Sequence, residues 1–373
     1  MKTFKHLYPQ ITAFENLWLA FKNAARGKRK NPNVAAFEYD LEENLLTLQT
    51  ELETQTYRPG AYYNFYIHDP KPRLISAAPF RDRLVHHALC QIIEPIFERR
   101  FIHDSYACRV GKGTHAALDR AQELARRFPY VLQCDLEHFF PTMDHAILHA
   151  ELARVIADPQ TLWLADQILD SGIHIHANEP PRYFAGDDLF AAIRPHGLPI
   201  GNLTSQFWAN VYLNPLDQFI KRELKCAGYV RYVDDFLLFA PDKFTLHGWR
   251  TRVIEFAATL RQTLHEERAQ VFPTVTGIPF LGWRIYPDHR RLDGASLARC
   301  PLRGQRIIVA PSRRNGIAFQ RRWARLRRKY AEGKIARKQL DAAINGWLAH
   351  AAHGDTWGLR HALLSRVVVP RTQ

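Results

Sequence analysis

The chain has few cysteines, no long apolar run and a shortage of acidic side chains. Its 5 cysteines are odd in number, widely spaced and without a paired metal-binding motif, which argues against a disulfide framework and a zinc module. The N-terminus lacks the apolar stretch of a signal peptide, and no segment approaches the roughly 20 consecutive apolar residues of a membrane span. We therefore expect a soluble cytoplasmic protein in a reducing compartment.

The charge of the chain is strongly positive and unevenly distributed. Lys and Arg number 51 against 37 Asp and Glu, and almost the whole excess lies beyond residue 300. Basic side chains set against phosphates release condensed counterions and strengthen binding to a polyanion, although a solvated basic face has the same composition. Aromatic residues interleaved with the basic ones favour nucleic acid, because their rings can stack on bases. They are Trp323, Tyr330, Trp347 and Trp357.

The chain of 373 residues is long enough for two or three lobes. Apolar spacing predicts helices between residues 10 and 58, and alternation interrupted by prolines predicts a short antiparallel hairpin over 62–77. Further helices are expected at 80–98, 114–127, 205–224 and, rich in basic residues, within 313–366, and strands at 130–135, 229–240 and 278–286. No internal repeat is visible.

Two adjacent acids stand in the middle of the strand-rich segment 229–240. Apolar arms flank Asp234 and Asp235, which predicts a hairpin with these two acids as the centre of its turn. Tight hairpin turns favour Asn-Gly or Asp-Gly, since both central residues need positive φ, so two carboxylates are a poor choice for stability alone. The functional interpretation is a cation bound between the acids, and the alternative is an ordinary solvated acidic turn.

A third acid ends another short apolar run. Asp135 follows the strand 130–134 and precedes two aromatic residues, Phe139 and Phe140, by four and five positions. Alone, this pattern also fits a helix cap. Together with the acidic hairpin it can hold two Mg²⁺ ions about 3.5–4 Å apart, one activating an attacking hydroxyl and one clamping the leaving phosphate oxygens. The acids therefore predict phosphoryl transfer, and polymerisation fits this inventory.

Three segments, spread over about residues 60–290, resemble consecutive palm motifs of reverse transcriptases. They are 135–140, 232–235 and 280–283. The resemblance implies an α+β fold of the right-hand polymerase type, with fingers, a palm, a helical N-terminal extension and a basic helical thumb. The implied bounds are 1–58 for the extension, 59–128 for the fingers, 129–290 for the palm and 291–373 for the thumb.

The same resemblance implies the activity and its metal site. The enzyme would be an RNA-directed DNA polymerase, a nucleotidyltransferase, with RNA template, DNA or RNA primer and deoxynucleoside triphosphates as ligands. Asp135 and Asp234 would bind two Mg²⁺ ions, for which Mn²⁺ can substitute. Leu136 would lend its carbonyl to the metals, and Asp235 would assist.

Further residues acquire roles through this resemblance. Phe140 matches an aromatic that packs under the sugar and excludes a 2′-hydroxyl, although a core aromatic is the alternative. Arg73 and Lys71 match cations that contact the triphosphate. Arg73 would donate two hydrogen bonds in a fixed geometry, and Lys71 would act as a movable point charge. Both could instead be surface charges. The turn that grips the primer end would consist of Leu281, Gly282 and Trp283.

The segment 197–206 narrows the resemblance. Most reverse transcriptases have Gln-Gly and Ser-Pro where this chain has Ile200-Gly201 and Ser205-Gln206, a substitution typical of diversity-generating retroelements. That subgroup implies error-prone copying of a template-repeat RNA for mutagenic retrohoming, with help from a small basic accessory variability protein. Ile200 and Gln206 are thereby candidate nucleotide-binding residues. An aliphatic side chain contacts the nascent base pair by shape alone, so it distinguishes correct from mismatched pairs less well than a hydrogen-bonding amide does. Packing against the backbone is an alternative reason for an isoleucine at position 200.

The general acid is left open by the sequence. Many relatives have a Lys that can protonate the leaving pyrophosphate, whereas this chain has His265 and Arg268 in the aligned stretch. His265 is the candidate acid, with a helix-surface residue as the alternative. Arg268 would offset charge but hardly donate a proton, given its pKa above about 12.

Two other interpretations remain. A group II intron, retron or phage-defence reverse transcriptase would share the palm and its acids. The chain stops after the basic helices at Gln373, which weakens the mobile-intron version because no endonuclease or zinc module follows. A catalytically inactive RNA-binding scaffold is the alternative from another class, and the intact Asp135, Asp234 and Asp235 argue against it.

Overall fold

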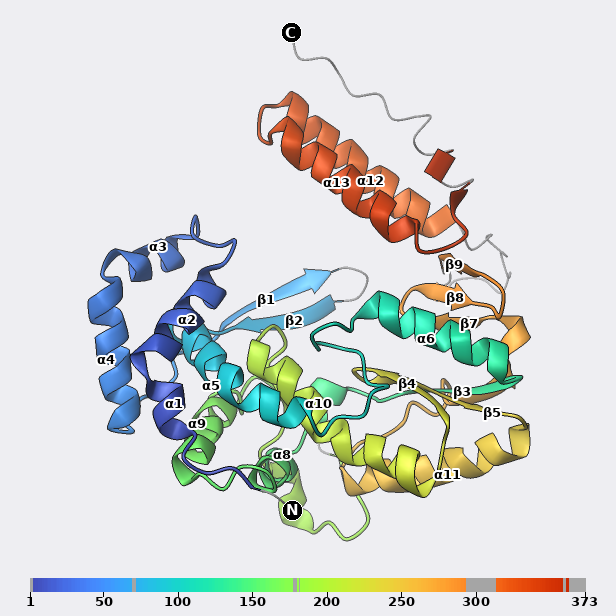
Figure 1. The fold of residues 1–373 in the computed structure, drawn as a ribbon, viewed down its shortest axis with the longest axis horizontal. Helices are drawn as coiled ribbons and strands as arrows, with labels where there is room; N and C mark the ends of the chain where they lie inside the picture. The colour runs from blue at the N-terminus through green and yellow to red at the C-terminus, as the bar shows by residue number, and fades with distance from the viewer. Residues whose placement is uncertain are drawn as a thin grey trace.

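The N-terminal part of the chain folds into helices that pack on one longer helix. The computed structural model describes residues 3–68, 72–176, 180, 182–292, 313–357 and 360–361. The helices are α1 (Tyr8–Thr12), α2 (Phe14–Ala25), α3 (Pro32–Tyr39), α4 (Leu41–Glu53) and the longer α5 (Phe80–Glu98). In α2, Leu17, Phe21 and Ala24 recur at helical spacing and are buried, and this helix packs on α5 (Figure 1). The helices predicted between residues 10 and 58 and at 80–98 are therefore confirmed.

The predicted antiparallel hairpin lies between α4 and α5. Its strands β1 (Tyr63–His68) and β2 (Pro72–Ala77) pair from Tyr63 opposite Ala77 to His68 opposite Pro72. All six residues of β1 are exposed, and the hairpin extends from the helical lobe toward the side on which the C-terminal helices lie (Figure 1). Its aromatic side chains are therefore open to ligands.

A four-stranded antiparallel sheet forms the centre of the molecule, in the order β4-β5-β3-β6. The strands are β3 (Tyr130–Asp135), β4 (Gly228–Tyr232), β5 (Asp235–Ala240) and β6 (Gln270–Pro273). Helix α6 (Thr114–Arg127) covers one face and α11 (Lys243–Thr259) the other (Figure 1). Successive side chains of a strand point to opposite faces of the sheet, so the core has two parts. Val131 packs in the cluster that contains residues of α6, and Leu132 packs in the larger cluster that contains residues of α11.

The segment between β3 and β4 is mainly helical. It contains α7 (Phe139–Thr142), α8 (His145–Ala153), α9 (Pro159–Asp170), a short 3₁₀ turn (Leu189–Ile193), α10 (Leu203–Gln218) and a π-helical turn (Phe219–Glu223). Helix α10 is buried along most of its length and contacts α5, α8 and α11. No helix within the described ranges is both long and apolar enough to cross a bilayer.

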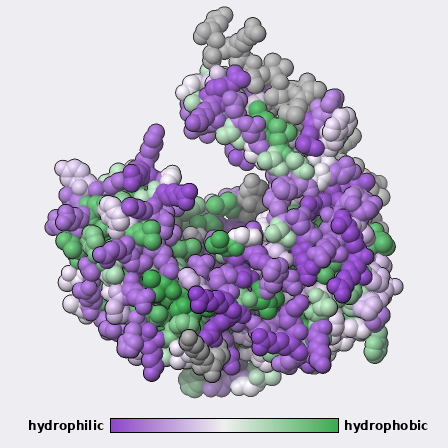
Figure 2. All heavy atoms as spheres, viewed as in Figure 1, coloured by the Kyte–Doolittle hydropathy of each residue, from purple (hydrophilic) through white to green (hydrophobic). Residues whose placement is uncertain are grey.

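The C-terminal part adds a small sheet and a helical hairpin. Strands β7 (Ile278–Phe280), β8 (Trp283–Ile285) and β9 (Arg290–Leu292) form an antiparallel sheet beside α6, after a 3₁₀ turn (Thr274–Thr276). Helices α12 (Arg313–Ala331) and α13 (Arg337–Ala351) pack through the buried side chains of Trp323 and Leu340. They project from the body, and Figure 2 shows a hollow between them and the N-terminal lobe.

Candidate active site

Three acids predicted from the sequence meet at one edge of the central sheet. Asp135 is the last residue of β3, and it stands directly opposite Asp235, the first residue of β5. Asp234 precedes Asp235 in the turn between β4 and β5. Residues a hundred positions apart in the chain are thus neighbours because the two strands pair in this register.

The turn that bears the acids differs from the prediction by one residue. Tyr232 pairs with Asp235, so the two central residues are Val233 and Asp234, and Asp235 belongs to the strand. Val233 has a φ of 57°, and Asp234 is not among the described residues with positive φ, as expected for a type II′ turn. Positive φ at a β-branched residue destabilises the folded protein by about 1–3 kcal/mol, so it requires stabilising contacts from the surrounding structure.

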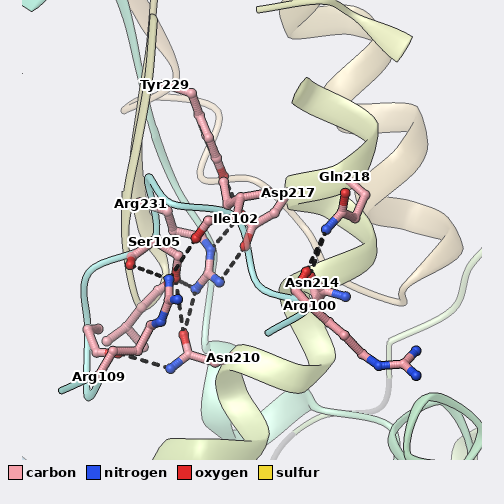
Figure 3. A network of polar contacts seen from close by, with 12 residues as sticks. Arg100, Ile102, Ser105, Arg109, Asn210, Asn214, Asp217, Gln218, Tyr229 and Arg231 are labelled. Carbon is pink, nitrogen blue, oxygen red and sulfur yellow. Dashed lines mark hydrogen bonds and ion pairs between the residues drawn. The ribbon is translucent and has the colours of Figure 1, made fainter. Parts of the chain in front are cut away.

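Arg231 supplies that support, and Figure 3 shows its side chain beside those of Asp217 and Asn210. Its side chain is fully buried, and Nη1 donates a hydrogen bond of 3.0 Å to the carbonyl of Val233. Nε and Nη2 each donate to the buried carboxylate of Asp217 on α10, at 2.7 Å. Tyr229 Oη also donates to Asp217, at 2.8 Å, and Asn210 Oδ1 accepts from Nη1 of Arg231 at 3.3 Å. This network ties the acidic turn to α10.

Sequence patterns hardly indicate this network. In the sequence, Arg231 lies within an apolar arm of the predicted hairpin. A buried ion pair such as that of Asp217 with Arg231 follows no characteristic sequence spacing, so local patterns do not predict it. The one hint is that a charged residue breaks an otherwise apolar strand, because buried arginines in proteins are paired.

The environment opposes the negative charge of the acids. Burial raises the pKa of Asp234 to about 6, and the charge of Asp135 adds to the shift. Burial raises the pKa of Asp235 to about 7, and Asp135 and Asp234 both contribute. Arg73 counters the shift at Asp234, and Arg268 counters it at Asp235. Cations therefore stabilise the ionised site.

The donor set suits a hard divalent cation. Neighbouring carboxylates are the ligands that Mg²⁺ and Mn²⁺ prefer, and their repulsion is relieved by a bound cation. Asp135 forms an ion pair with Arg268, whose side chain is half exposed, and within the described ranges no three His, Cys, Asp or Glu side chains are arranged so that they could hold a metal ion. Leu136 is buried and forms an isolated antiparallel bridge with Leu264.

We expect the thermal stability of the metal-free protein to fall as the pH rises from about 5 to 8. With folded pKa values of about 6 and 7 against an ordinary 3.8, Asp234 and Asp235 retain protons that unfolded aspartates lose, and this advantage disappears above pH 7. Mg²⁺ should restore stability at pH 8, by about 2.7 kcal/mol at 100 times its Kd. Calorimetry with EDTA or Mg²⁺ measures both effects, and equal stabilisation by Mg²⁺ at pH 5 and pH 8 would contradict the assignment.

Hydrogen bonds fix the candidate nucleotide-binding residues Phe140 and Ile200 through the segment 197–202. Phe140 is half-buried whereas Phe139 belongs to the core, and the carbonyl of Phe140 accepts from Leu198 N at 2.8 Å. Two residues later, the carbonyl of Ile200 accepts from Ser76 N on β2 at 3.0 Å. Asn202 then donates to the carbonyl of Ser76 at 3.1 Å. The 197–202 segment is therefore fixed between α7 and the base of the β1–β2 hairpin.

The remaining nucleotide-binding candidates lie around this segment. Arg73 is exposed on β2, close enough for its charge to act on Asp234. Gln206 is exposed in the first turn of α10, and Ile200 is half-buried. Lys71 lies outside the described residues.

His265 lies in a loop beside the acids, so the helix-surface alternative is wrong. Helix α11 ends at Thr259, and the following chain pairs with the extension of β3, where His265 N donates to the carbonyl of Asp135 at 2.8 Å. The imidazole Nδ1 is buried without a hydrogen-bond partner. The backbone of His265 therefore lies directly beside that of Asp135.

The turn predicted to grip a primer end connects β7 and β8. Leu281 and Gly282 have φ values of 51° and 81°, as in the type I′ turns of two-residue hairpins. A bond of 2.7 Å from Gln133 Nε2 to the carbonyl of Pro279 joins this sheet to β3. Trp283 is fully buried, so its side chain supports the turn from behind instead of presenting a surface to a ligand.

A known family matches the part of the chain that holds the three acids, and individual proteins are similar to the chain. Residues 68–285 match the family described as Reverse transcriptase (RNA-dependent DNA polymerase). The Escherichia coli protein YkfC is 29% identical over 302 residues, covering 69% of this chain and 75% of that protein. The group II intron-encoded protein LtrA of Lactococcus lactis is 25% identical over 182 residues, covering 48% of this chain and 28% of the intron protein.

Two solved structures show a weaker likeness. Apo telomerase from Candida tropicalis gives a TM-score of 0.42 at 11% identity, covering 64% of this chain and 49% of that one. Telomerase from Candida albicans, in complex with a fragment of telomeric RNA, gives 0.40 at 12% identity, covering 66% and 48%. The chain thus spans about half of these solved chains, and 28% of the intron protein LtrA.

Proposed function

Since the chain belongs to the reverse transcriptase family, we propose that it extends a primer with deoxynucleotides along an RNA template. The observation that carries this proposal is the convergence of Asp135, Asp234 and Asp235 through the pairing of β3 with β5. Asp135, Asp234 and the carbonyl of Leu136 would hold two Mg²⁺ ions, and Asp235 would assist. Ions so held activate the primer hydroxyl and neutralise the leaving pyrophosphate.

The other residues around the acids would bind and orient the substrates. Arg73 would donate two hydrogen bonds to the oxygens of the triphosphate. Phe140 would lie under the sugar, where it leaves no room for a 2′-hydroxyl. Leu281 and Gly282 would contact the primer end through their exposed turn. His265 is our candidate for protonating the pyrophosphate, since its backbone lies beside Asp135 and its Nδ1 has no hydrogen-bond partner.

We assign the lobes by their positions relative to the acids. Residues 59–128 would be the fingers, 129–290 the palm and 291–373 the thumb, after an extension of 1–58. The exposed basic residues of α12 would follow the phosphates of the template–primer duplex across the hollow seen in Figure 2. Such contacts bind by shape and charge and not by sequence.

The finer proposal is error-prone copying for a diversity-generating retroelement. It is supported by Ile200, an aliphatic residue in a segment fixed against β2, at a position where an amide could test the nascent base pair. A small basic accessory variability protein would assist, and the product would replace a variable region. A group II intron role is the second candidate, favoured by the similarity to the intron-encoded protein LtrA.

Primer extension on an RNA template tests the proposal. The full chain is supplied with Mg²⁺ and deoxynucleotides, and its products are sequenced. Synthesis with errors concentrated opposite adenine is the expected result. Accurate synthesis would retain the polymerase and contradict the retroelement role, and no synthesis, even with a structured RNA and an accessory protein, would contradict the polymerase.

Ile200→Gln is expected to lower the error rate opposite adenine by about tenfold, the scale of one added discriminating hydrogen bond. The substitution leaves the backbone carbonyl that Ser76 N contacts in place. Ile200→Val is the matched control, because it keeps an aliphatic side chain and should keep the error spectrum. Deep sequencing of products from both variants measures the effect, and unchanged errors in Ile200→Gln would remove Ile200 from the fidelity argument.

A further inference from the structure

The turn after α13 fits closely against the buried side chain behind the primer-end turn. A Cβ on Gly354 would lie 2.2 Å from Cζ3 of Trp283 and 2.9 Å from the carbonyl oxygen of Arg290. Both distances are far below van der Waals contact, and one neighbour is backbone. Only glycine therefore allows this approach of the two segments.

Arg290 fastens the same turn to α6. Its carbonyl accepts from Asp355 N at 2.9 Å, and its guanidinium donates to the carbonyl of His353. The same guanidinium pairs with Asp119 on α6 at 2.6 Å. One residue of β9 thus joins the end of α13 to the helix that covers the central sheet.

Three imidazoles complete the contact. The ring of His115, on α6, stacks on that of His353 with centroids 3.5 Å apart, and it lies 5.5 Å from the ring of His350. His350 in turn lies 5.3 Å from Trp283. We refer to Trp283, His115, Arg290 and the turn 350–355 as the α13 seat.

We propose that the α13 seat fixes the angle of the α12–α13 hairpin over the primer-end turn, which makes Gly354 and Trp283 positioning residues for successive nucleotide addition. Helix α13 has 15 residues and at 1.5 Å per residue is about 22 Å long, so a tilt of about 10° at its base would move its tip by about 4 Å. Trp283 directly follows Leu281 and Gly282, so the seat and the primer-end turn share one hairpin.

This inference rests on the proposed polymerase function. A duplex held at the correct angle stays bound between additions, whereas the first addition from a saturated complex depends on the acids and the substrate-binding residues around them and not on the angle of α13. Disturbing the seat should therefore shorten products without slowing the first addition.

Gly354→Ala is the test, with Gly346→Ala as the matched control. The control adds the same methyl group to α13 where no atom lies within 4 Å. We expect Gly354→Ala to reduce the median product length several-fold in a single-encounter assay with a heparin trap, with an unchanged rate of first addition, and Gly346→Ala to match the wild type. Equal product lengths for all three would overturn the inference, whereas failure of the wild type to extend would overturn the polymerase itself.

The pH dependence of product length separates positioning from simple folding. Burial and neighbouring positive charge, from His350, His353 and Arg290, lower the pKa of His115, with Asp119 opposing. Burial and His353 lower the pKa of His350. A lowered pKa means that the seat is stable above pH 6.5 and weakens as the pH falls.

Product length, normalised to the first addition, should therefore shorten below about pH 6.5 in the wild type. His115→Phe keeps the stacked ring but cannot be protonated, so it should reduce this dependence. A pH profile identical to that of the wild type would overturn the role of His115 in the seat. His115→Phe also tests the inference if Gly354→Ala does not fold.

Discussion

Asp234→Asn is expected to abolish primer extension while RNA binding changes by less than about twofold. Asparagine keeps the size of the side chain but removes the charge that a divalent cation requires. Losing a metal ligand at a site where catalysis is almost entirely charge neutralisation should lower the rate by at least about 10³-fold, or about 4 kcal/mol. Filter binding to a structured RNA and extension under Mg²⁺ measure the two properties on the same protein.

The same variant carries an internal control for folding. Removing one of three mutually repelling carboxylates should raise the stability of the metal-free protein at pH 8 and reduce its response to Mg²⁺. Asp166→Asn is the matched control, because this acid lies on α9 in a partly exposed pair with His149, and such pairs contribute little. Persistent extension by Asp234→Asn, or loss of extension by Asp166→Asn, would refute the metal assignment.

Local sequence patterns predicted most of the elements. The helices at 80–98 and 114–127 and the strand at 130–135 have the predicted bounds, the helices because their apolar residues follow a helical period and the strand because its apolar run ends on Asp135. The acidic hairpin was displaced by one residue for an identifiable reason. Positive φ at Val233 is unfavourable locally, and it is maintained by the hydrogen bond from Arg231 to the Val233 carbonyl. A tertiary contact of this kind is not visible in a propensity argument.

The same limitation applies to the predicted site residues. By resemblance, Trp283 was predicted to form the primer-gripping turn with Leu281 and Gly282, yet its side chain is buried, and Gly354, some seventy positions later, packs against its ring. His265 was weighed as a helix-surface residue, but its backbone continues the pairing of β3 beyond Asp135. In both cases the packing of distant segments decides where the residue lies, and neither local spacing nor the resemblance shows that packing.

Arg231→Met is expected to cost about 3–5 kcal/mol of stability, because it leaves the carboxylate of Asp217 buried without its cation. Both side chains of this pair have no exposed surface, so solvent cannot compensate. Chemical denaturation measures the loss. Arg231→Lys is the conservative companion, which keeps the charge but cannot donate to Asp217 in bidentate fashion and to Val233 at once.

The double variant Arg231→Met/Asp217→Leu separates stability from positioning. Replacing a buried ion pair by apolar residues of similar volume is often neutral or stabilising, so unfolding should return to within about 1 kcal/mol of the wild type. Extension should remain at least about tenfold lower, because nothing then donates to the Val233 carbonyl and the turn that carries Asp234 is free to relax. A double variant that regains both stability and full extension would show that the network serves folding alone. Recovery of stability without activity would identify Arg231 as the residue through which α10 holds the acidic turn in its working conformation.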